Sequence, residues 1–215
     1  MKKLVIFDLD GTLLNTIADL AAATNFALEA CGFPTHIPSI YPTLVGNGVT
    51  KLIERALPAE HRDEATIETV RRRFMEYYDN HCCDLTVPYP GIKELLQTLA
   101  QRGIDVAVAS NKYQAAVERI VSHYFPDVKW AAVEGHREGV PSKPDPSIVF
   151  GILAIHPTPK ADVLYVGDSG VDIDTAHRAC VDCVGVTWGF RPESELKAHY
   201  ADNIAETPAD ILALL

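Results

Sequence analysis

Residues 4–12 of the chain read Leu-Val-Ile-Phe-Asp-Leu-Asp-Gly-Thr, and this stretch decides the fold class. Four consecutive apolar residues, Leu4 to Phe7, are typical of a short strand that is buried on both faces of a parallel sheet. Two acids, Asp8 and Asp10, follow at once, and Gly11 allows the chain to turn there. Because aspartate is depleted in strands and interiors, this pair at a strand end needs a functional reason.

Further along the chain, short apolar runs alternate with segments whose apolar residues recur at helical spacing. Strands are expected at 104–109, 130–133, 162–166 and 183–187, and helices at 92–102, 113–124, 147–154 and 173–180. This alternation predicts an α/β protein with a Rossmann-like parallel sheet and helices on both faces.

The stretch between the first two strands has helical periodicity and no convincing strand. We therefore predict an all-helical cap domain at residues 16–84, inserted into a catalytic α/β core domain that comprises residues 1–15 and 85–215. The segment Gly46-Asn47-Gly48 in the cap is either a simple turn or a flexible loop that closes on a substrate. We favour the second interpretation and assign Gly46, Asn47 and Gly48 to substrate binding.

Composition and charge exclude several classes of function. Of the 215 residues, 47% are apolar and 22% are charged, which is the balance of a folded protein. The formal net charge of −10 argues against nucleic acid or an anionic membrane surface as the main partner. The apolar run at the start is too short for a signal peptide or a membrane span, so we expect a cytoplasmic location.

The five cysteines are an odd number in a chain without an export signal, and we expect them to be reduced thiols. Cys180 and Cys183 form a C-x-x-C pair, with His177 three residues earlier. A zinc site there would need a fourth ligand. We therefore favour small buried residues at a helix end and in the following strand.

Four groups of polar residues fall at related places in the expected sheet. Asp8 and Asp10 follow the end of the first strand, and Ser110 and Asn111 follow the end of the second. Lys143 precedes a helix, and Asp168 follows the end of a later strand. Three of these groups therefore follow the carboxyl ends of parallel strands, where open α/β sheets bind ligands, and Lys143 can fold back over the same edge.

Together these residues form a chemically coherent set. Asp8, Asp10 and Asp168 offer hard oxygen ligands to a small divalent cation, and a carboxylate such as Asp8 can attack phosphorus. Ser110 and Lys143 can hold the oxygens of a transferring phosphoryl group. Several carboxylates in one site would repel one another without cations, so both a metal ion and Lys143 are expected on electrostatic grounds.

The ordered motifs DLDGT, SN, a Lys-Pro pair and GDSxxD resemble those of the haloacid dehalogenase superfamily, specifically its phosphatases. They extend from Asp8 to Asp172, and four motifs in order are a strong signal where one would be moderate. Within the helical insertion, TLVGNGVTKLIERALP is similar to the corresponding stretch of bacterial phosphoglycolate phosphatases. GVTWGFRPESEL near the end resembles the same subfamily.

The resemblance implies a role for each matching residue. Asp8 would be the nucleophile, and Asp10 the general acid and then base, with its backbone carbonyl on Mg²⁺. Asp168 would be the third magnesium ligand. Phosphate would be bound by Ser110, Asn111 and Lys143, and we add Thr12 to the substrate-binding set. Asp172 would orient metal-bound water or Lys143, with Ser169 beside it, although both are also ordinary helix-capping types.

Two positions depart from the family pattern. Asn15 stands where the family often has Asp, at a position that we interpret as a hinge or cap contact. Ser142 precedes Lys143 where many relatives have His or Lys, which leaves Lys143 itself unaffected.

Several functions remain open at this point. The leading one is a magnesium-dependent hydrolase of a small phosphorylated metabolite, with phosphoglycolate as first candidate and an aspartyl-phosphate intermediate. A phosphomutase shares all four motifs, and a catalytically inactive phosphate-binding regulatory module is the alternative outside enzymes. A dehalogenase would not use Asp10, and a phosphonate-cleaving enzyme would need Lys51 as a Schiff-base lysine. The sequence is compatible with a monomer and with a homodimer.

Overall fold

The computed structural model describes all residues from Met1 to Leu215. The chain forms two compact units, one of Met1–Asn15 with Pro88–Leu215 and one of Thr16–Val87. None of its helices combines the length and the apolar character that a membrane crossing would require.

The first unit is built on a six-stranded sheet in the order β5-β4-β1-β6-β7-β8, and every neighbouring pair is parallel. The strands are β1 (Leu4–Phe7), β4 (Asp105–Tyr113), β5 (Trp130–His136), β6 (Val163–Gly167), β7 (Asp182–Val186) and β8 (Asn203–Ala205). Two two-residue strands, β2 (Leu14–Asn15) and β3 (Val87–Pro88), are not part of this sheet. The expected α/β class is confirmed. The edge strand β8 was not expected, because three residues are too few to show a period.

β1 lies in the middle of the sheet and is completely buried, as its apolar run predicts. Phe7 pairs with Val108 of β4 on one side and with Val166 of β6 on the other. The chain moves outward from β1 in one direction through β4 and β5, and in the other through β6, β7 and β8. The carboxyl end of β1 is therefore a topological switch point, where sheets of this kind hold their ligands.

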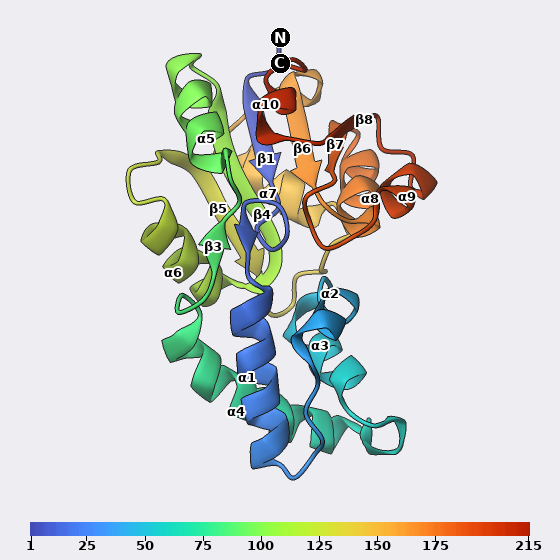
Figure 1. Ribbon diagram of the computed structural model, residues 1–215. Coiled ribbons are helices and arrows are strands. Elements are labelled where there is room, and N and C mark those ends of the chain that lie inside the picture. The colour runs from blue at the N-terminus through green and yellow to red at the C-terminus, as the bar shows by residue number, and fades with distance from the viewer. The chain divides into compact units, whose positions relative to one another are not determined.

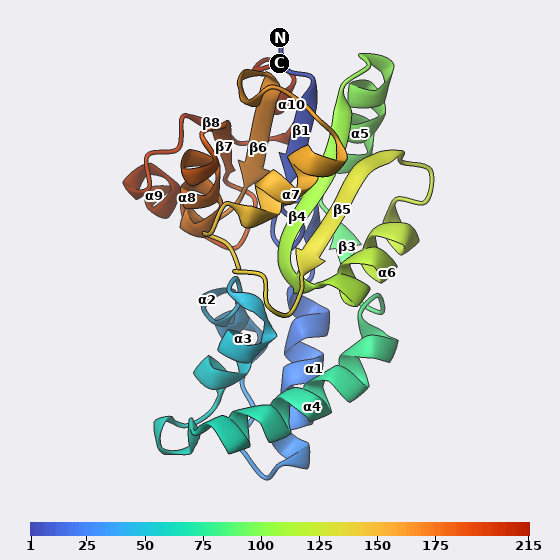
Figure 2. The same ribbon diagram turned by 180° about the vertical axis from the view of Figure 1, so that it is seen from behind.

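Helices cover both faces of the sheet. In Figure 1, α5 and α10 lie in front of the strands, and Figure 2 shows α7 in front when the molecule is seen from behind. The helices of this unit are α5 (Ile92–Gln101), α6 (Gln114–Tyr124), α7 (Ser147–Ile155), η3 (Lys160–Asp162), α8 (Gly170–Ala179), α9 (Glu193–Ala198) and α10 (Pro208–Ile211). A core of apolar residues beneath α7 and α8 includes Ile6, Val149 and Ile173, all fully buried.

Three elements differ from the expected ones by three or more residues at one end, and β5 is one of them because it continues to His136. β4 continues past Ala109 to Tyr113, with a register shift against β5 in this stretch. α8 begins at Gly170 instead of residue 173, because Ser169 and Asp172 form a reciprocal capping box at its start.

The second unit is helical. Its elements are α1 (Ile17–Ala30), η1 (Pro38–Ile40), α2 (Tyr41–Leu44), α3 (Gly48–Ala56), η2 (Ala59–His61) and α4 (Glu64–His81). α1 and α3 both pack against α4. From α4, Phe74 and Tyr78 stack on one another and are almost fully buried, which makes these aromatic residues part of the core. This unit therefore has its own apolar core.

Asp19 in the first turn of α1 connects the first helix of this unit to residues 85 and 86 near its end. The side chain is only 2% exposed, and its two carboxylate oxygens accept the backbone N–H groups of Leu85 and Thr86 at 2.9 and 2.8 Å. Residues 85 and 86 consequently belong with the helices, and the compact unit ends after Val87, whereas the sequence analysis placed the boundary after Asp84.

Asp19→Ala should destabilise the helical unit by about 2–4 kcal/mol, because it leaves one buried and one partly buried amide without an acceptor. The matched control is Asp63→Ala, which removes an exposed N-cap of α4 that accepts from Thr66 and should cost about 1 kcal/mol. Denaturant unfolding by circular dichroism measures both losses, and hydrogen exchange at Leu85 and Thr86 localises the first. An Asp19→Ala loss no larger than that of Asp63→Ala would contradict this account.

Candidate active site

The buried polar residues of the first unit gather at the carboxyl ends of its central strands. Asp8 directly follows β1, and its N–H continues the sheet by donating to the carbonyl of Val166 at 2.9 Å. Ser110 lies in the last part of β4, and Asp168 directly follows β6. Lys143 comes from the loop between β5 and α7. Asp8, Ser110, Lys143 and Asp168 are all buried.

Lys143 links two of the acids. Its Nζ lies 2.7 Å from Oδ1 of Asp8 and 2.7 Å from Oδ1 of Asp172, and it also donates to the carbonyl of Ala109 at 2.9 Å. The hydroxyl of Tyr165 is a further neighbour at 3.2 Å. All three hydrogens of the ammonium group are therefore used, and its charge offsets two buried carboxylates.

The backbone of Lys143 is held just as firmly by Asn111. The Asn111 amide nitrogen donates to the carbonyl of Lys143 at 3.2 Å, and its Oδ1 accepts the N–H of Lys143 at 2.8 Å. These contacts let Asn111 position the Lys143 loop. Its direct binding of phosphate stays a prediction.

Asp172 combines the two roles that the sequence left open. Its Oδ2 accepts from the hydroxyl of Ser169 at 2.6 Å and from the N–H of Ser169 at 3.2 Å, while its Oδ1 accepts from Lys143. The capping box of α8 thus orients a carboxylate toward the buried lysine. Gly167 is required here, because a Cβ at this position would overlap the Asp172 side chain.

Burial and mutual repulsion control the protonation of these groups. Burial, followed by the charges of Asp172 and Asp10, raises the pKa of Asp8 to about 7, although the nearby Lys143 opposes the shift. Burial also raises the pKa of Asp168 well above its usual range, and the charges of Asp172 and Asp8 add to this effect. Burial opposes the charged form of Lys143, but Asp172 and Asp8 more than compensate and raise its pKa. Asp8 and Asp168 therefore keep raised pKa values even with Lys143 beside them.

The arrangement fits a divalent cation with a preference for oxygen. Asp8, Asp168 and Asp172 each place a carboxylate oxygen within 4.8 Å of the others. The sequence analysis proposed Asp8, Asp10 and Asp168 instead. Both oxygens of Asp172 are already engaged by Lys143 and Ser169, so Asp8 and Asp168 are the better placed ligands of this cluster.

Asp168 has its own supports. Its Oδ2 accepts the N–H of Phe190 at 2.7 Å, and the chain approaches its carboxyl group closely at two glycines. A Cβ at either Gly11 or Gly189 would overlap the Asp168 side chain. These contacts fix one oxygen of Asp168 and define its surroundings, as a metal ligand requires.

Lys112 is a site residue that the sequence analysis missed. Its Nζ lies 3.1 Å from Oδ2 of Asp10, and its side chain is only 5% exposed. Its N–H donates to Oγ of Ser110 at 3.2 Å. Oδ1 of Asp10 is buried and has no hydrogen-bond partner. One oxygen of Asp10 is thus held while the other is available. The signal in the sequence was a lysine directly after the Ser110-Asn111 pair.

The remaining predicted residues have other contacts. The hydroxyl of Thr12 is buried without a partner, and its carbonyl accepts from Nε1 of Trp188 at 3.0 Å. Gly46, Asn47 and Gly48 belong to the helical unit, where Oδ1 of Asn47 accepts from Nη2 of Arg55 at 2.7 Å. Their binding of substrate stays a prediction.

Comparison with known proteins identifies the family. The model of the haloacid dehalogenase-like hydrolase family matches residues 5–186. The chain is 33% identical to a phosphoglycolate phosphatase of Pasteurella multocida, with 99% of this chain and 98% of that protein covered, and 34% identical to one of Mannheimia succiniciproducens, with the same coverage. A crystal structure of a predicted phosphoglycolate phosphatase from Haemophilus somnus superposes with a TM-score of 0.89 at 30% identity, covering 99% of this chain and 97% of that one.

The chain therefore belongs to the haloacid dehalogenase-like hydrolases, as the four motifs indicated. Within this family it is a phosphatase. The family resemblance noted in the sequence is confirmed.

Proposed function

We propose that this phosphatase is a magnesium-dependent phosphomonoester hydrolase that acts on a small phosphorylated metabolite, first of all phosphoglycolate, through an aspartyl-phosphate on Asp8. The observation that carries the proposal is the buried contact of Lys143 with Asp8 at the carboxyl end of β1. It places a cation next to a carboxylate that can act as a nucleophile, at the switch point of the sheet.

Each of these residues has its own role in the proposed reaction. A carboxylate oxygen of Asp8 attacks phosphorus, and the bond from phosphorus to the leaving alkoxide breaks as Asp10 delivers a proton to that oxygen. Asp10 then removes a proton from a water molecule, which attacks the phosphorus of the aspartyl-phosphate and returns Asp8 as a carboxylate. Lys143 and Ser110 hold the phosphoryl oxygens in both steps.

Mg²⁺ is the proposed cofactor, bound by the side chains of Asp8 and Asp168 and the backbone carbonyl of Asp10. When bound it supplies positive charge to the phosphoryl oxygens and to the buried carboxyl groups of Asp8, Asp168 and Asp172. The pKa of Asp8, raised to about 7 by burial, would fall next to such a charge, which favours the nucleophilic form.

The proposed substrate follows from the relatives. Curated proteins that match along almost their full length bear the name phosphoglycolate phosphatase. A phosphomutase would transfer the phosphoryl group back to a sugar and not to water. Release of inorganic phosphate in proportion to the alcohol product, measured on phosphoglycolate and a panel of other phosphorylated metabolites, separates the two activities.

We also propose that the helical unit acts as a mobile cap that closes over Asp8 and selects the substrate. The chain enters this unit after Asn15, only a few residues beyond the nucleophile, and leaves it before Pro88. Closure would exclude water during phosphoryl transfer, and opening would release product. A closed cap would favour small phosphoesters over phosphoproteins.

Removal of the divalent cation should abolish turnover, and Mg²⁺ should restore it, because Asp8 and Asp168 are hard oxygen ligands in a site with excess negative charge. Ca²⁺ should inhibit, since its larger and more variable coordination does not align Asp8 with phosphorus. The measurement is the steady-state release of phosphate from phosphoglycolate in chelator, in chelator with excess Mg²⁺, and in Ca²⁺. Full activity in excess chelator would rule out the proposed metal dependence.

Asp10→Asn should slow hydrolysis of an alkyl phosphate on the order of 100- to 10,000-fold, because proton transfer is lost. Formation of the aspartyl-phosphate from p-nitrophenyl phosphate should suffer less, because nitrophenolate leaves without a proton. Lys112→Met should lower the rate of hydrolysis on the order of 10- to 100-fold, because Asp10 is then misplaced.

The double variant Asp10→Asn with Lys112→Met tests whether the lysine works through Asp10. It should then be no slower than Asp10→Asn alone. Additive losses would give Lys112 an independent role, and a wild-type rate for Asp10→Asn on alkyl phosphates would assign the proton transfer to another group.

Asn47→Ala and Lys51→Ala should change the ranking of substrates more than they change the dependence on Mg²⁺, because both residues belong to the proposed cap. Arg73→Ala is the matched control in the same unit, since Arg73 is an exposed residue of α4 paired with Glu76. The measurement is kcat/KM for phosphoglycolate and for several larger phosphoesters with each variant. Uniform losses, or no losses, would remove substrate selection from these two residues.

A further inference from the structure

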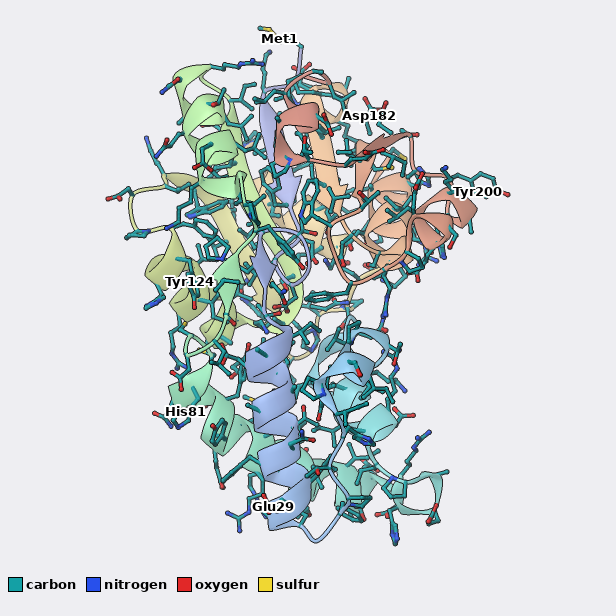
Figure 3. All side chains as sticks on the ribbon, viewed as in Figure 1. Met1, Glu29, His81, Tyr124, Asp182 and Tyr200 are labelled. Atoms are coloured by element: carbon teal, nitrogen blue, oxygen red, sulfur yellow. The ribbon has the colours of Figure 1, made fainter.

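A second cluster of side chains that can bind a metal lies at the amino ends of the strands, whereas Asp8 lies at their carboxyl ends. It consists of His177 in the last turn of α8, Cys183 near the start of β7, and Asp202 directly before β8. Because the strands are parallel, the start of β7 and the end of β1 are on opposite edges. Figure 3 labels Asp182 and Tyr200, the neighbours of this cluster along the chain. The active-site chemistry uses none of these residues.

The three side chains are close enough to share one ion. Sγ of Cys183 lies 3.5 Å from Nε2 of His177 and 3.3 Å from Oδ2 of Asp202, and Nε2 of His177 lies 3.8 Å from Oδ1 of Asp202. Zinc bonds of about 2.3 Å to sulfur and about 2.0–2.2 Å to nitrogen or oxygen imply ligand separations of roughly 3.4–3.6 Å in a tetrahedron. The two separations from Sγ of Cys183 are within about 0.1 Å of this range. The contact from His177 is to the other oxygen of Asp202, and one ligand atom from each of the three residues lies within 4.8 Å of the others.

The backbone holds two of the ligands in place. Oδ2 of Asp202 accepts the N–H of Cys183 at 2.8 Å, and Sγ of Cys183 accepts the N–H of Asp202 at 3.5 Å. Hydrogen bonds of this kind orient metal ligands and favour a charged sulfur. The side chains of His177 and Asp202 are 37% and 44% exposed, so an ion can approach from solvent, whereas Cys183 is buried beneath them.

We propose that His177, Cys183 and Asp202 form a binding site for a divalent transition metal ion of the zinc type, with water in the fourth position. One sulfur, one imidazole nitrogen and one carboxylate oxygen favour zinc or cobalt over Mg²⁺, which prefers oxygen alone. The ion would connect α8, β7 and the segment before β8.

Binding of the ion would displace the thiol proton. In the structure the thiol of Cys183 donates to Oδ2 of Asp202 at 3.3 Å. Replacement of that proton by a metal ion would exchange this hydrogen bond for metal–sulfur and metal–oxygen bonds and release the proton to solvent.

For the C-x-x-C pair the sequence analysis favoured small buried residues over a zinc site, which is correct for the burial of Cys183 and wrong for Cys180. Cys180 is exposed, stands at the end of α8 with a φ of 58°, and is not part of the cluster. The third ligand is Asp202 instead, which is far away in the sequence and could not be associated with His177 and Cys183 by spacing.

Titration of the reduced full-length protein with Co²⁺, in the presence of excess Mg²⁺, tests the proposal. Wild type should show a thiolate-to-cobalt charge-transfer band in the near ultraviolet, together with visible bands of a tetrahedral ion, and Zn²⁺ should bleach both. The acidic active site holds no sulfur and cannot produce the charge-transfer band. The Cys180→Ser variant is the matched control and should keep the band.

Two variants then identify the ligands. Cys183→Ser should abolish the charge-transfer band, and His177→Ala, at a half-exposed position that leaves the core intact, should weaken Co²⁺ binding on the order of tenfold or more. Phosphatase activity with Mg²⁺ should be unchanged in His177→Ala. The absence of a band in wild type, its survival in His177→Ala with unchanged affinity, or its dependence on Cys180 would each overturn the proposal.

Discussion

The contact of Lys143 with Asp8 and Asp172 is the interaction on which the site depends. It brings one ammonium group into a buried space that contains several carboxyl groups, with both carboxylate contacts at 2.7 Å. In such surroundings an unpaired charge is costly, and loss of one partner of a buried ion pair costs about 3–5 kcal/mol. Removal of one partner would therefore be costly, and in the proposed reaction the contact places a cation beside the nucleophile Asp8.

The surrounding structure serves to keep this lysine in place. Asn111 holds its backbone, and the capping box at the start of α8 fixes the carboxylate that receives it. Close approach of the chain at Gly11 and Gly167 leaves no space for side chains next to Asp168 and Asp172. Residues from four segments thus meet at the carboxyl ends of the central strands. Most of them form hydrogen bonds or ion pairs with one another.

Even so, the balance of charge at this edge is incomplete. Burial and repulsion raise the pKa values of Asp8 and Asp168, and a further cation nearby would favour their ionised forms. This imbalance is the physical basis for a metal ion in the proposed reaction.

The helical unit differs from the sheet unit in its interior. Its core is apolar, and its charged groups pair mostly within their own helices, as Lys51 does with Glu54.

The sequence alone determined the class of fold, the alternation of strands and helices up to β7, and the acids at the end of β1, because a buried strand followed by paired aspartates has few other interpretations. It could not determine that Lys112 holds Asp10, that Asn111 holds the Lys143 loop, or that Asp202 lies next to Cys183. These contacts join side chains to partners whose position depends on how separate strands align in the sheet. Local patterns report helical and strand periods, whereas only tertiary packing brings together residues that are distant in the chain.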